Sequence, residues 1–147
     1  MSGWTIRQSR ADEQERLHRI WHDAVRATHG FLADADFQFY SGLVRDEMLP
    51  QAGFWVAADA DDRAVGFLHL EGSKVEALFV DPTRHRQGIG RALMEHARRL
   101  SPEPELDANE ESGAVAYYRR LGFREVGRSP VDGAGRPYPL VHMRLGG

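Results

Sequence analysis

A short segment from Arg84 to Arg91 carries the residue types that could bind an anion. It reads Arg-His-Arg-Gln-Gly-Ile-Gly-Arg, so two glycines stand among arginines. Glycine leaves the backbone open to close approach, and arginine side chains add positive charge. If a helix begins at the first glycine, its leading amide hydrogens have no partner inside the helix and point at the anion. This segment predicts a binding site for a phosphate or pyrophosphate group.

A strand and a helix are needed on either side to position this segment. An apolar run rich in strand-forming residues precedes it: Val75, Leu78, Phe79 and Val80. Asp81-Pro82 ends the strand, because proline has no amide hydrogen to give to a ladder. The apolar residues that follow recur with the spacing of one helix face: Ile89, Ala92, Leu93, Ala97 and Leu100. We therefore expect a strand ending near Val80 and a helix beginning near Gly88.

Three other interpretations of the glycine segment can be compared with this one. A dinucleotide fingerprint requires a third glycine three residues after the second, where this chain has Leu93. A P-loop requires Gly-Lys-Ser/Thr, and the sequence here is Gly90-Arg91-Ala92. A plain turn that opens a helix stays an alternative, because short glycine motifs are common.

The rest of the chain predicts further strands and helices. The apolar face of the first helix is formed by Leu17, Ile20, Trp21, Ala24, Val25 and Thr28. A second helix is capped by Asp34 or Asp36, continues to Met48 and ends at Pro50. Strands are expected at residues 4–8, 54–58, 64–70, around 106, 123–129 and 139–144, with another helix at 112–121. No repeat or linker interrupts this order, so we expect a single mixed α+β domain over residues 1–147.

Composition limits the possible functions. The 147 residues are 41% hydrophobic and 28% charged, which is typical of a globular enzyme domain. A net charge of -3 gives no general attraction to nucleic acid or an anionic membrane. The chain has no cysteine, and His18 and His22 lack a third ligand, so neither a thiol nucleophile nor a metal site is expected. No apolar leader or membrane span is present, which favours the cytoplasm.

Two motifs together resemble the GNAT family of acetyl-CoA-dependent N-acetyltransferases. The glycine segment, preceded by Leu-Phe-Val-Asp-Pro, resembles the family's Arg/Gln-x-x-Gly-x-Gly/Ala pyrophosphate loop, with His85 at the first position. The segment from Tyr118 to Phe123 resembles its Tyr-x-Lys/Arg-x-Gly-Phe motif. Residues 27–32, 127–129 and 137–140 are similar to those of a small bacterial branch. This resemblance implies three layers, with a mostly antiparallel sheet of about six to seven strands and about four helices.

The resemblance also implies which residues hold acetyl-CoA. In the family, the pantetheine arm pairs with the backbone of the strand before the loop, as an added strand would. The residues expected to bind the cofactor are Leu78, Phe79, Val80, His85, Arg86, Gln87, Gly88, Ile89, Gly90, Arg91, Asn109 and Tyr118. Asn109 takes the place of a family asparagine upstream of the tyrosine, although the spacing from Asn109 to Tyr118 is one residue shorter than is usual in the family.

Acetyl transfer requires an acid that protonates the leaving thiolate. Tyr118 holds the family's tyrosine position, and a hydroxyl with a pKa of about 10 can serve a thiol with a pKa of about 8.5. Tyr117 would point about 100° around the helix. The alternative is that Tyr118 packs in the core with Ala114 and Leu121, which are four residues before it and three after it.

A base must take the proton of the ammonium before it attacks. Glu76 is expected to do so from the central strand, where it has the parity of Leu78 and Val80. His29, His69 or an ordered water are alternatives. With no cysteine and no apparent Ser/His pair, we expect direct transfer without a covalent enzyme intermediate.

The acceptor is a small-molecule amine, an amino acid or a peptide. The family lines its acceptor cleft with the first two helices and the last hairpin, which here implies Trp21, Thr28, His29, Phe31 and Tyr138. The sequence thus predicts an N-acetyltransferase, and a homodimer is one oligomeric state that it allows. An acyl-CoA sensor without turnover is the alternative, and nucleic-acid binding through the loop arginines is a third class that the acidic balance of the chain disfavours.

Overall fold

The structure, a computed structural model, describes residues 4–84 and 86–146. Its strands are β1 (Thr5–Gln8), β2 (Phe54–Ala58), β3 (Ala64–Glu71), β4 (Lys74–Val80), β5 (Glu105–Asn109), β6 (Phe123–Ser129) and β7 (Leu140–Leu145). Its α-helices are α1 (Gln14–Thr28), α2 (Asp34–Leu43), α3 (Ile89–Leu100) and α4 (Ala114–Arg120). Short 3₁₀ turns lie at Ala11–Glu13 and Pro82–Arg84, and a π-helical turn at Val44–Met48 follows α2.

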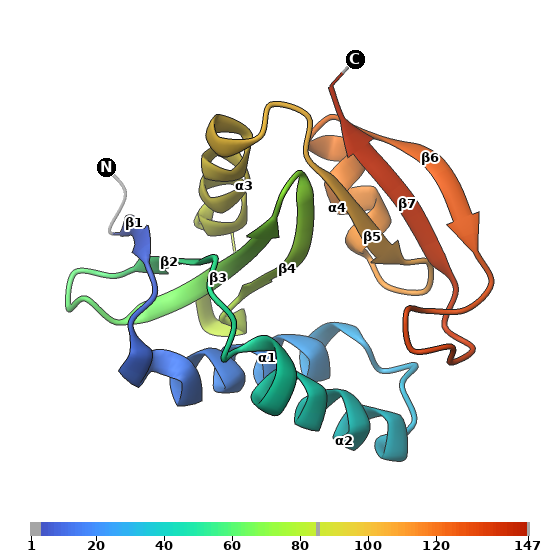
Figure 1. Cartoon of the computed structure of the whole chain (residues 1–147), viewed down its shortest axis with the longest axis horizontal. Helices are drawn as coiled ribbons and strands as arrows, with labels where there is room; N and C mark the ends of the chain where they lie inside the picture. Colours follow the sequence, from blue (N-terminus) through green and yellow to red (C-terminus); the bar gives the residue numbers. More distant parts are fainter. Residues whose placement is uncertain (1–3, 85, 147) are drawn as a thin grey trace.

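The seven strands form one sheet in the order β1-β2-β3-β4-β5-β7-β6 (Figure 1). Every neighbouring pair is antiparallel except β4 and β5, which are parallel. The sequence-based expectation of a mixed, mostly antiparallel α+β fold is therefore confirmed. The parallel pair arises because α3 connects β4 to β5 as a crossover.

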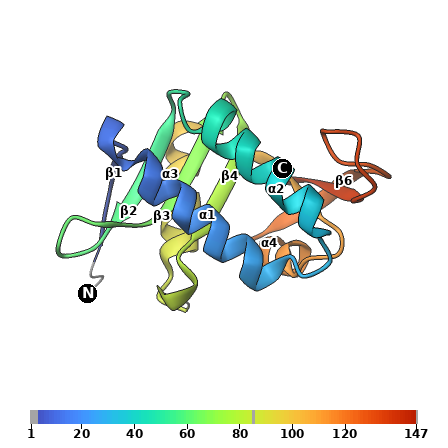
Figure 2. The same ribbon diagram turned by 90° about the horizontal axis from the view of Figure 1, so that it is seen from below.

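Helices cover the sheet in two layers, and each layer buries its own core. Helices α1 and α2 cross one face, as the view from below shows (Figure 2). They bury a cluster that includes Leu17, Ile20 and Phe37 against β2 and β3. Helices α3 and α4 pack on the opposite face, where Leu93 and Met143 are fully buried. Residues that alternate along the strands supply these two cores in turn.

The expected apolar faces are present with three exceptions, two in the first two helices and one at the end of α3, where Leu100 was assigned to the apolar face but is 51% exposed. Thr28 was assigned to the apolar face of α1, but it is exposed at the last position of the helix. Its hydroxyl donates to the Ala24 carbonyl at 2.8 Å. The second helix is not α-helical to Met48, because the Leu49 amide donates to Val44, five residues back, at 2.9 Å. None of the helices within the described residues is long and apolar enough to cross a bilayer.

The core beneath α3 gives a prediction for stability. Leu93 is 0% exposed, so Leu93→Ala removes buried methyl groups and leaves a cavity, which should lower the free energy of unfolding by about 2–5 kcal/mol. Leu100 on the same helix is 51% exposed, and Leu100→Ala should change it by less than about 0.5 kcal/mol. Urea unfolding of both variants measures the difference. Equal losses would contradict this assignment of the core.

Candidate functional site

The site is built around a gap between the parallel strands β4 and β5. In the described chain only one position pairs them, Lys74 opposite Glu105, at the start of both strands. Beyond it the strands diverge (Figure 1), while β4 stays paired with β3 as far as Val80. The β5-facing backbone of β4 therefore has no strand partner over its second half. Such an edge can accept an extended chain as an added strand.

The glycine loop lies at the open end of this gap. Gly88 caps α3 with a φ of 77°, in the left-handed region that favours glycine, and none of the described side chains caps the helix. The Gly88 carbonyl accepts the Ala92 amide at 2.9 Å, which starts the helical ladder. The amides of Ile89, Gly90 and Arg91 precede that first bond, so they have no acceptor inside the helix. His85 lies outside the described residues.

Charged partners hold the start of the loop in place. Asp81 accepts hydrogen bonds from Arg16 at 2.9 Å and from the Thr83 amide at 3.0 Å. These bonds hold the pKa of Asp81 below its usual value, although burial acts in the opposite direction. Arg84 was expected to add positive charge for an anion, but it pairs with Asp59 at 3.0 Å. Its charge is therefore partly neutralised, whereas Arg86 and Arg91 are exposed.

Tyr117 closes one side of the loop. A Cβ at Gly90 would collide with the Tyr117 hydroxyl, so a larger residue at this position requires the Tyr117 side chain to shift. Burial raises the pKa of Tyr117, and the nearby charges of Arg91 and Arg120 act against that rise. The sequence placed Tyr117 away from Tyr118 around α4, but the two rings contact each other edge-on with centroids 5.2 Å apart.

Tyr118 packs inward from α4. Its ring contacts Phe123 in an edge-on arrangement with centroids 5.5 Å apart, and it belongs to the partly buried residues around the core of α3. Ala114 and Leu121 pack on the same core, so the packing interpretation of Tyr118 is correct as a description of its ring. Burial raises its pKa strongly, which keeps the hydroxyl protonated. No hydrogen-bond partner for that hydroxyl occurs among the described residues, and its role as an acid stays a prediction.

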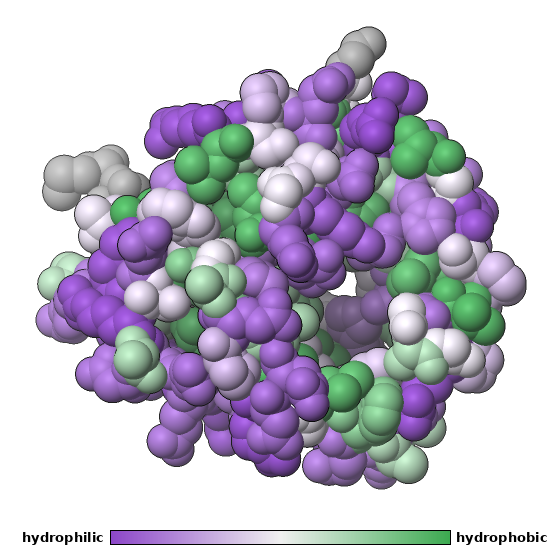
Figure 3. All heavy atoms as spheres, in the orientation of Figure 1, coloured by the Kyte–Doolittle hydropathy of each residue, from purple (hydrophilic) through white to green (hydrophobic). Residues whose placement is uncertain are grey.

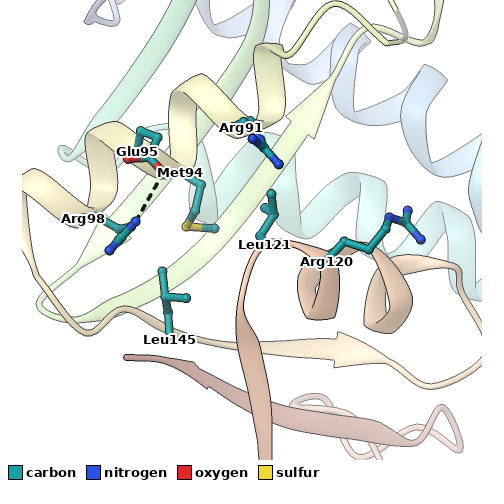
Figure 4. A pocket seen from close by; sticks show the side chains of 7 residues that line it. All are labelled: Arg91, Met94, Glu95, Arg98, Arg120, Leu121 and Leu145. Carbon is teal, nitrogen blue, oxygen red and sulfur yellow. Dashed lines mark hydrogen bonds and ion pairs between the residues drawn. The ribbon is translucent and has the colours of Figure 1, made fainter. Parts of the chain in front are cut away.

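A small hollow between α3 and the end of α4 is rich in arginine. It has a volume of about 120 Å³, and its lining residues are Arg91, Met94, Glu95, Arg98, Arg120, Leu121 and Leu145 (Figure 4). Arg98 pairs with Glu95 at 3.3 Å, while no ion pair of Arg91 or Arg120 is found in the described part of the chain. The α3 face near the glycine loop is therefore positively charged.

A larger cleft opens on the opposite face, beneath α1 and α2. Its volume is about 700 Å³, and Figure 3 shows a hollow near the middle of the molecule, where hydrophilic residues lie at the back. The lining residues are Trp21, Val25, His29, Leu32, Tyr40, Leu43, Val44, Glu47, Met48, Gln51, His69, Glu71, Glu76, Phe79, Asp107, Asn109, Asp132, Gly133, Ala134, Tyr138 and Leu140. Because Glu76, Phe79 and Asn109 come from β4 and β5, the gap between these strands leads into the cleft.

Glu76 reaches this cleft for a reason that the sequence did not show. It was expected to share the side of β4 taken by Leu78 and Val80, but those two residues pack on the core under α3. The register pairs His69 with Ala77 and Leu70 with Val75, so Glu76 is an extra residue in a β-bulge. A bulge redirects its side chain. Glu76 therefore lines the cleft together with Phe79, and the assignment by parity was wrong.

The predicted acceptor residues divide into two groups. Trp21, His29 and Tyr138 line the cleft, whereas Thr28 and Phe31 do not. Thr28 lies within 2.6 Å of the His29 Nδ1 atom, and the Phe31 ring contacts Tyr138 with centroids 5.9 Å apart. Thr28 and Phe31 therefore stand behind the lining residues. Burial lowers the pKa of His29, which favours its neutral form.

The loop between β6 and β7 is fastened to α2 across the cleft. Arg136 donates to Asp36 at 2.8 Å, and the Tyr138 hydroxyl donates to the other oxygen of the same carboxylate. The Tyr40 hydroxyl donates to Asp132 in the loop. The hydrogen bond from Tyr138 holds the pKa of Asp36 below its usual value, with help from Arg136. These contacts keep residues 132–134 over one wall of the cleft.

Sequence reasoning missed a hydrogen-bonded chain on the open face of β5, β7 and β6. Asp107 accepts from Nδ1 of His142 at 2.5 Å and from Lys74 at 2.8 Å. Because Nδ1 carries the proton, Nε2 of a neutral His142 accepts from the Ser129 hydroxyl at 2.7 Å. A Ser/His pair therefore does exist, contrary to expectation, but neither residue lines the cleft. The alternation of Leu106 and Ala108 with polar neighbours was the signal that could have placed Asp107 on this face.

The contact between Gly90 and Tyr117 can be tested by a double-mutant cycle. Gly90→Ala forces the Tyr117 hydroxyl to move, and Tyr117→Phe removes that hydroxyl, which leaves the next ring carbon 3.5 Å from the new methyl group. Gly90→Ala should therefore cost less in the Tyr117→Phe background, with a coupling of about 0.5–3 kcal/mol in the free energy of unfolding. Gly113→Ala is the control, because nothing lies within 4 Å of the position that its new methyl group would occupy. Additive effects would show that the close approach has no energetic consequence.

Comparison with known proteins agrees with this geometry. A family profile described as an acetyltransferase (GNAT) domain matches residues 27–145. The peptidyl-lysine N-acetyltransferase YjaB of Salmonella typhimurium is 45% identical over 139 residues, covering 94% of this chain and 95% of the relative. YjaB of Escherichia coli is 44% identical over 140 residues, covering 95% of each chain.

Solved structures show the same fold. The solution structure of apo-form YjaB from Escherichia coli matches with a TM-score of 0.92 and 43% identity, covering 98% of each chain. The PaiA N-acetyltransferase of Thermoplasma acidophilum, solved in complex with coenzyme A, matches in fold with a TM-score of 0.75 at 20% identity, covering 99% of each chain. The chain, with its glycine loop at the N-terminus of α3, belongs to the GNAT family of acetyl-CoA-dependent N-acetyltransferases.

Proposed function

We propose that this N-acetyltransferase acetylates the side-chain amine of lysine residues in proteins. The observation that carries the proposal is the position of Glu76, whose carboxylate lines the acceptor cleft from the bulge in β4, beside the gap between β4 and β5. A base there lies where an amine from the cleft can meet a thioester held along β4. The names of the two YjaB relatives, both peptidyl-lysine N-acetyltransferases, support this class of acceptor.

The proposed cofactor contacts follow from the shape of the gap. The uncapped amides at the start of α3 and the exposed charges of Arg86 and Arg91 suit the diphosphate of acetyl-CoA. The free edge of β4 at Leu78, Phe79 and Val80 suits its pantetheine arm. The remaining predicted contacts, which stay part of the proposal, are Gln87, Gly88, Ile89, Gly90, Asn109 and Tyr118.

In the proposed reaction, Glu76 takes a proton from the lysine ammonium, so that the amine lone pair becomes free to attack. A bond forms between the amine nitrogen and the acetyl carbon, and the bond from that carbon to sulfur breaks. Tyr118, which its raised pKa keeps protonated at neutral pH, gives its hydroxyl proton to the departing thiolate. The nitrogen loses its second proton as the amide forms, and that proton restores the tyrosine hydroxyl. Backbone amides of β4 that lack a strand partner can stabilise the carbonyl oxygen.

A peptide assay tests this proposal directly. A peptide with one internal lysine and blocked ends, incubated with acetyl-CoA and the enzyme, should release CoA in step with acetylation of that lysine, located by mass spectrometry. Modification of free amines but of no peptide would contradict lysine acetylation in proteins. The absence of any CoA release, together with tight acetyl-CoA binding, would instead favour the sensor without turnover.

Two substitutions test the assigned roles. Tyr118→Phe keeps the packed ring and removes the acid, and Glu76→Gln keeps the size and removes the base. Each should lower kcat by about 10²–10⁴-fold while acetyl-CoA affinity stays unchanged. In Glu76→Gln the rate should also rise about tenfold per pH unit below the lysine pKa of about 10.4, because only pre-formed free amine reacts.

The matched control is Glu103→Gln, which removes one carboxylate from an exposed position outside the cleft. Its kcat should equal that of the unmodified enzyme. Unchanged rates for Tyr118→Phe would assign the tyrosine to packing alone, and unchanged rates for Glu76→Gln would favour another base or an ordered water.

Three wider expectations from the sequence also belong to this proposal. All seven strands belong to one sheet, which supports residues 1–147 as a single domain. A cytoplasmic location and a homodimer stay predictions. Gel filtration with light scattering measures whether the protein is a homodimer.

A further inference from the structure

Three carboxylates in the acceptor cleft have no partner among the described residues. Glu47 comes from the π-helical turn after α2, Glu71 from the end of β3, and Glu76 from the bulge of β4, and all three line the cleft. None of them makes an ion pair or accepts a side-chain hydrogen bond in the part of the chain that the structure describes. Asp107 and Asp132, which also line the cleft, are held by Lys74 and Tyr40.

The positive charge of Lys74 acts on Glu76 from beside the cleft, but Lys74 is already bonded to Asp107. Among its described lining residues none is a lysine or an arginine. Carboxylates that face a shared concave space repel one another and concentrate a negative potential there. A cationic ligand relieves this repulsion, so the cleft is suited to positive charge.

A buried histidine adds an independent sign of a missing donor. His69 also lines the cleft and is only 3% exposed. Its Nε2 atom lies 3.1 Å from the Ala52 carbonyl, which can only accept, so Nε2 carries the proton and Nδ1 is an acceptor. That Nδ1 atom is buried and has no partner among the described residues. A buried acceptor without a donor is costly, and a ligand N–H group would satisfy it.

We infer that the cleft binds the acceptor lysine together with a second cationic residue of the same protein segment. This inference rests on the proposed function. Acetylation requires one base, for which Glu76 is sufficient, whereas Glu47 and Glu71 lie on the same cleft and have no task in the reaction. The cleft volume of about 700 Å³ exceeds what one lysine arm requires. A lysine or arginine flanking the acceptor would pair with the surplus carboxylates.

Three peptides of equal length test this inference. Each has one acetylatable lysine, flanked by arginines in the first, by serines in the second and by glutamates in the third. The arginine peptide should have a kcat/KM about five- to tenfold above the serine peptide, as expected for one or two partly exposed ion pairs. The glutamate peptide should be slowest. The advantage of the arginine peptide should shrink as salt is raised, because ions screen exposed charges.

A double variant shows whether these carboxylates are responsible. Glu47→Gln with Glu71→Gln should reduce the ratio of the arginine to the serine peptide toward one, mainly through the KM of the arginine peptide. Glu103→Gln removes an equal kind of charge outside the cleft and should keep the full ratio. A ratio that persists in the double variant would overturn the assignment to these residues.

The possible outcomes separate the inference from the function on which it rests. Equal rates for the arginine and serine peptides would overturn the second cation but leave lysine acetylation intact. No acetylation of any peptide would overturn the proposed function. A kcat/KM for spermidine above that of the arginine peptide would show that the cleft prefers a small polyamine. It would overturn the inference that the cleft binds a protein segment.

Discussion

The divergence of β4 from β5 is the constraint on which the rest of the structure depends. Lys74 and Glu105 form the single paired position between them in the described chain, and beyond it both strands present a free edge. Backbone amides and carbonyls inside a protein require partners, so such an edge persists where a ligand can supply them. The gap also joins the glycine loop to the cleft beneath α1 and α2. A continuous sheet would have separated the two.

The gap between β4 and β5 has opposite charge at its two ends, the glycine loop and the cleft. Around α3, Arg91 and Arg120 are without an ion pair among the described residues, while in the cleft Glu47 and Glu71 are without one. A net charge of -3 for the whole chain conceals this separation. Under the proposed assignment of the two sites, an anionic cofactor and a cationic acceptor approach from different faces of the sheet. Each side attracts its own ligand and repels the other, which favours correct placement before reaction.

Two local departures from regular structure aim side chains into the cleft. The extra residue in β4 turns Glu76 toward the face opposite Leu78. The π-helical turn at Val44–Met48 adds a residue to the helical turn after α2 and brings Glu47 to the cleft wall. Bulges and π-turns of this kind disturb regular hydrogen bonding, so they persist where the redirected side chain has a use. The positions of Glu47 and Glu76 on the cleft wall thus depend on backbone irregularities.

The sequence by itself determined the elements and the loop. Periodicity predicted the helices and strands, because burial on one face repeats every 3.6 residues in a helix and every two in a strand. The glycines on either side of Ile89 indicated the N-terminus of α3. Only the tertiary structure decided that Arg84 is paired with Asp59 and that Asp107 holds His142. It also decided the direction of Glu76. These features depend on the register of distant strands and on partners far apart in the chain, about which local spacing contains no information.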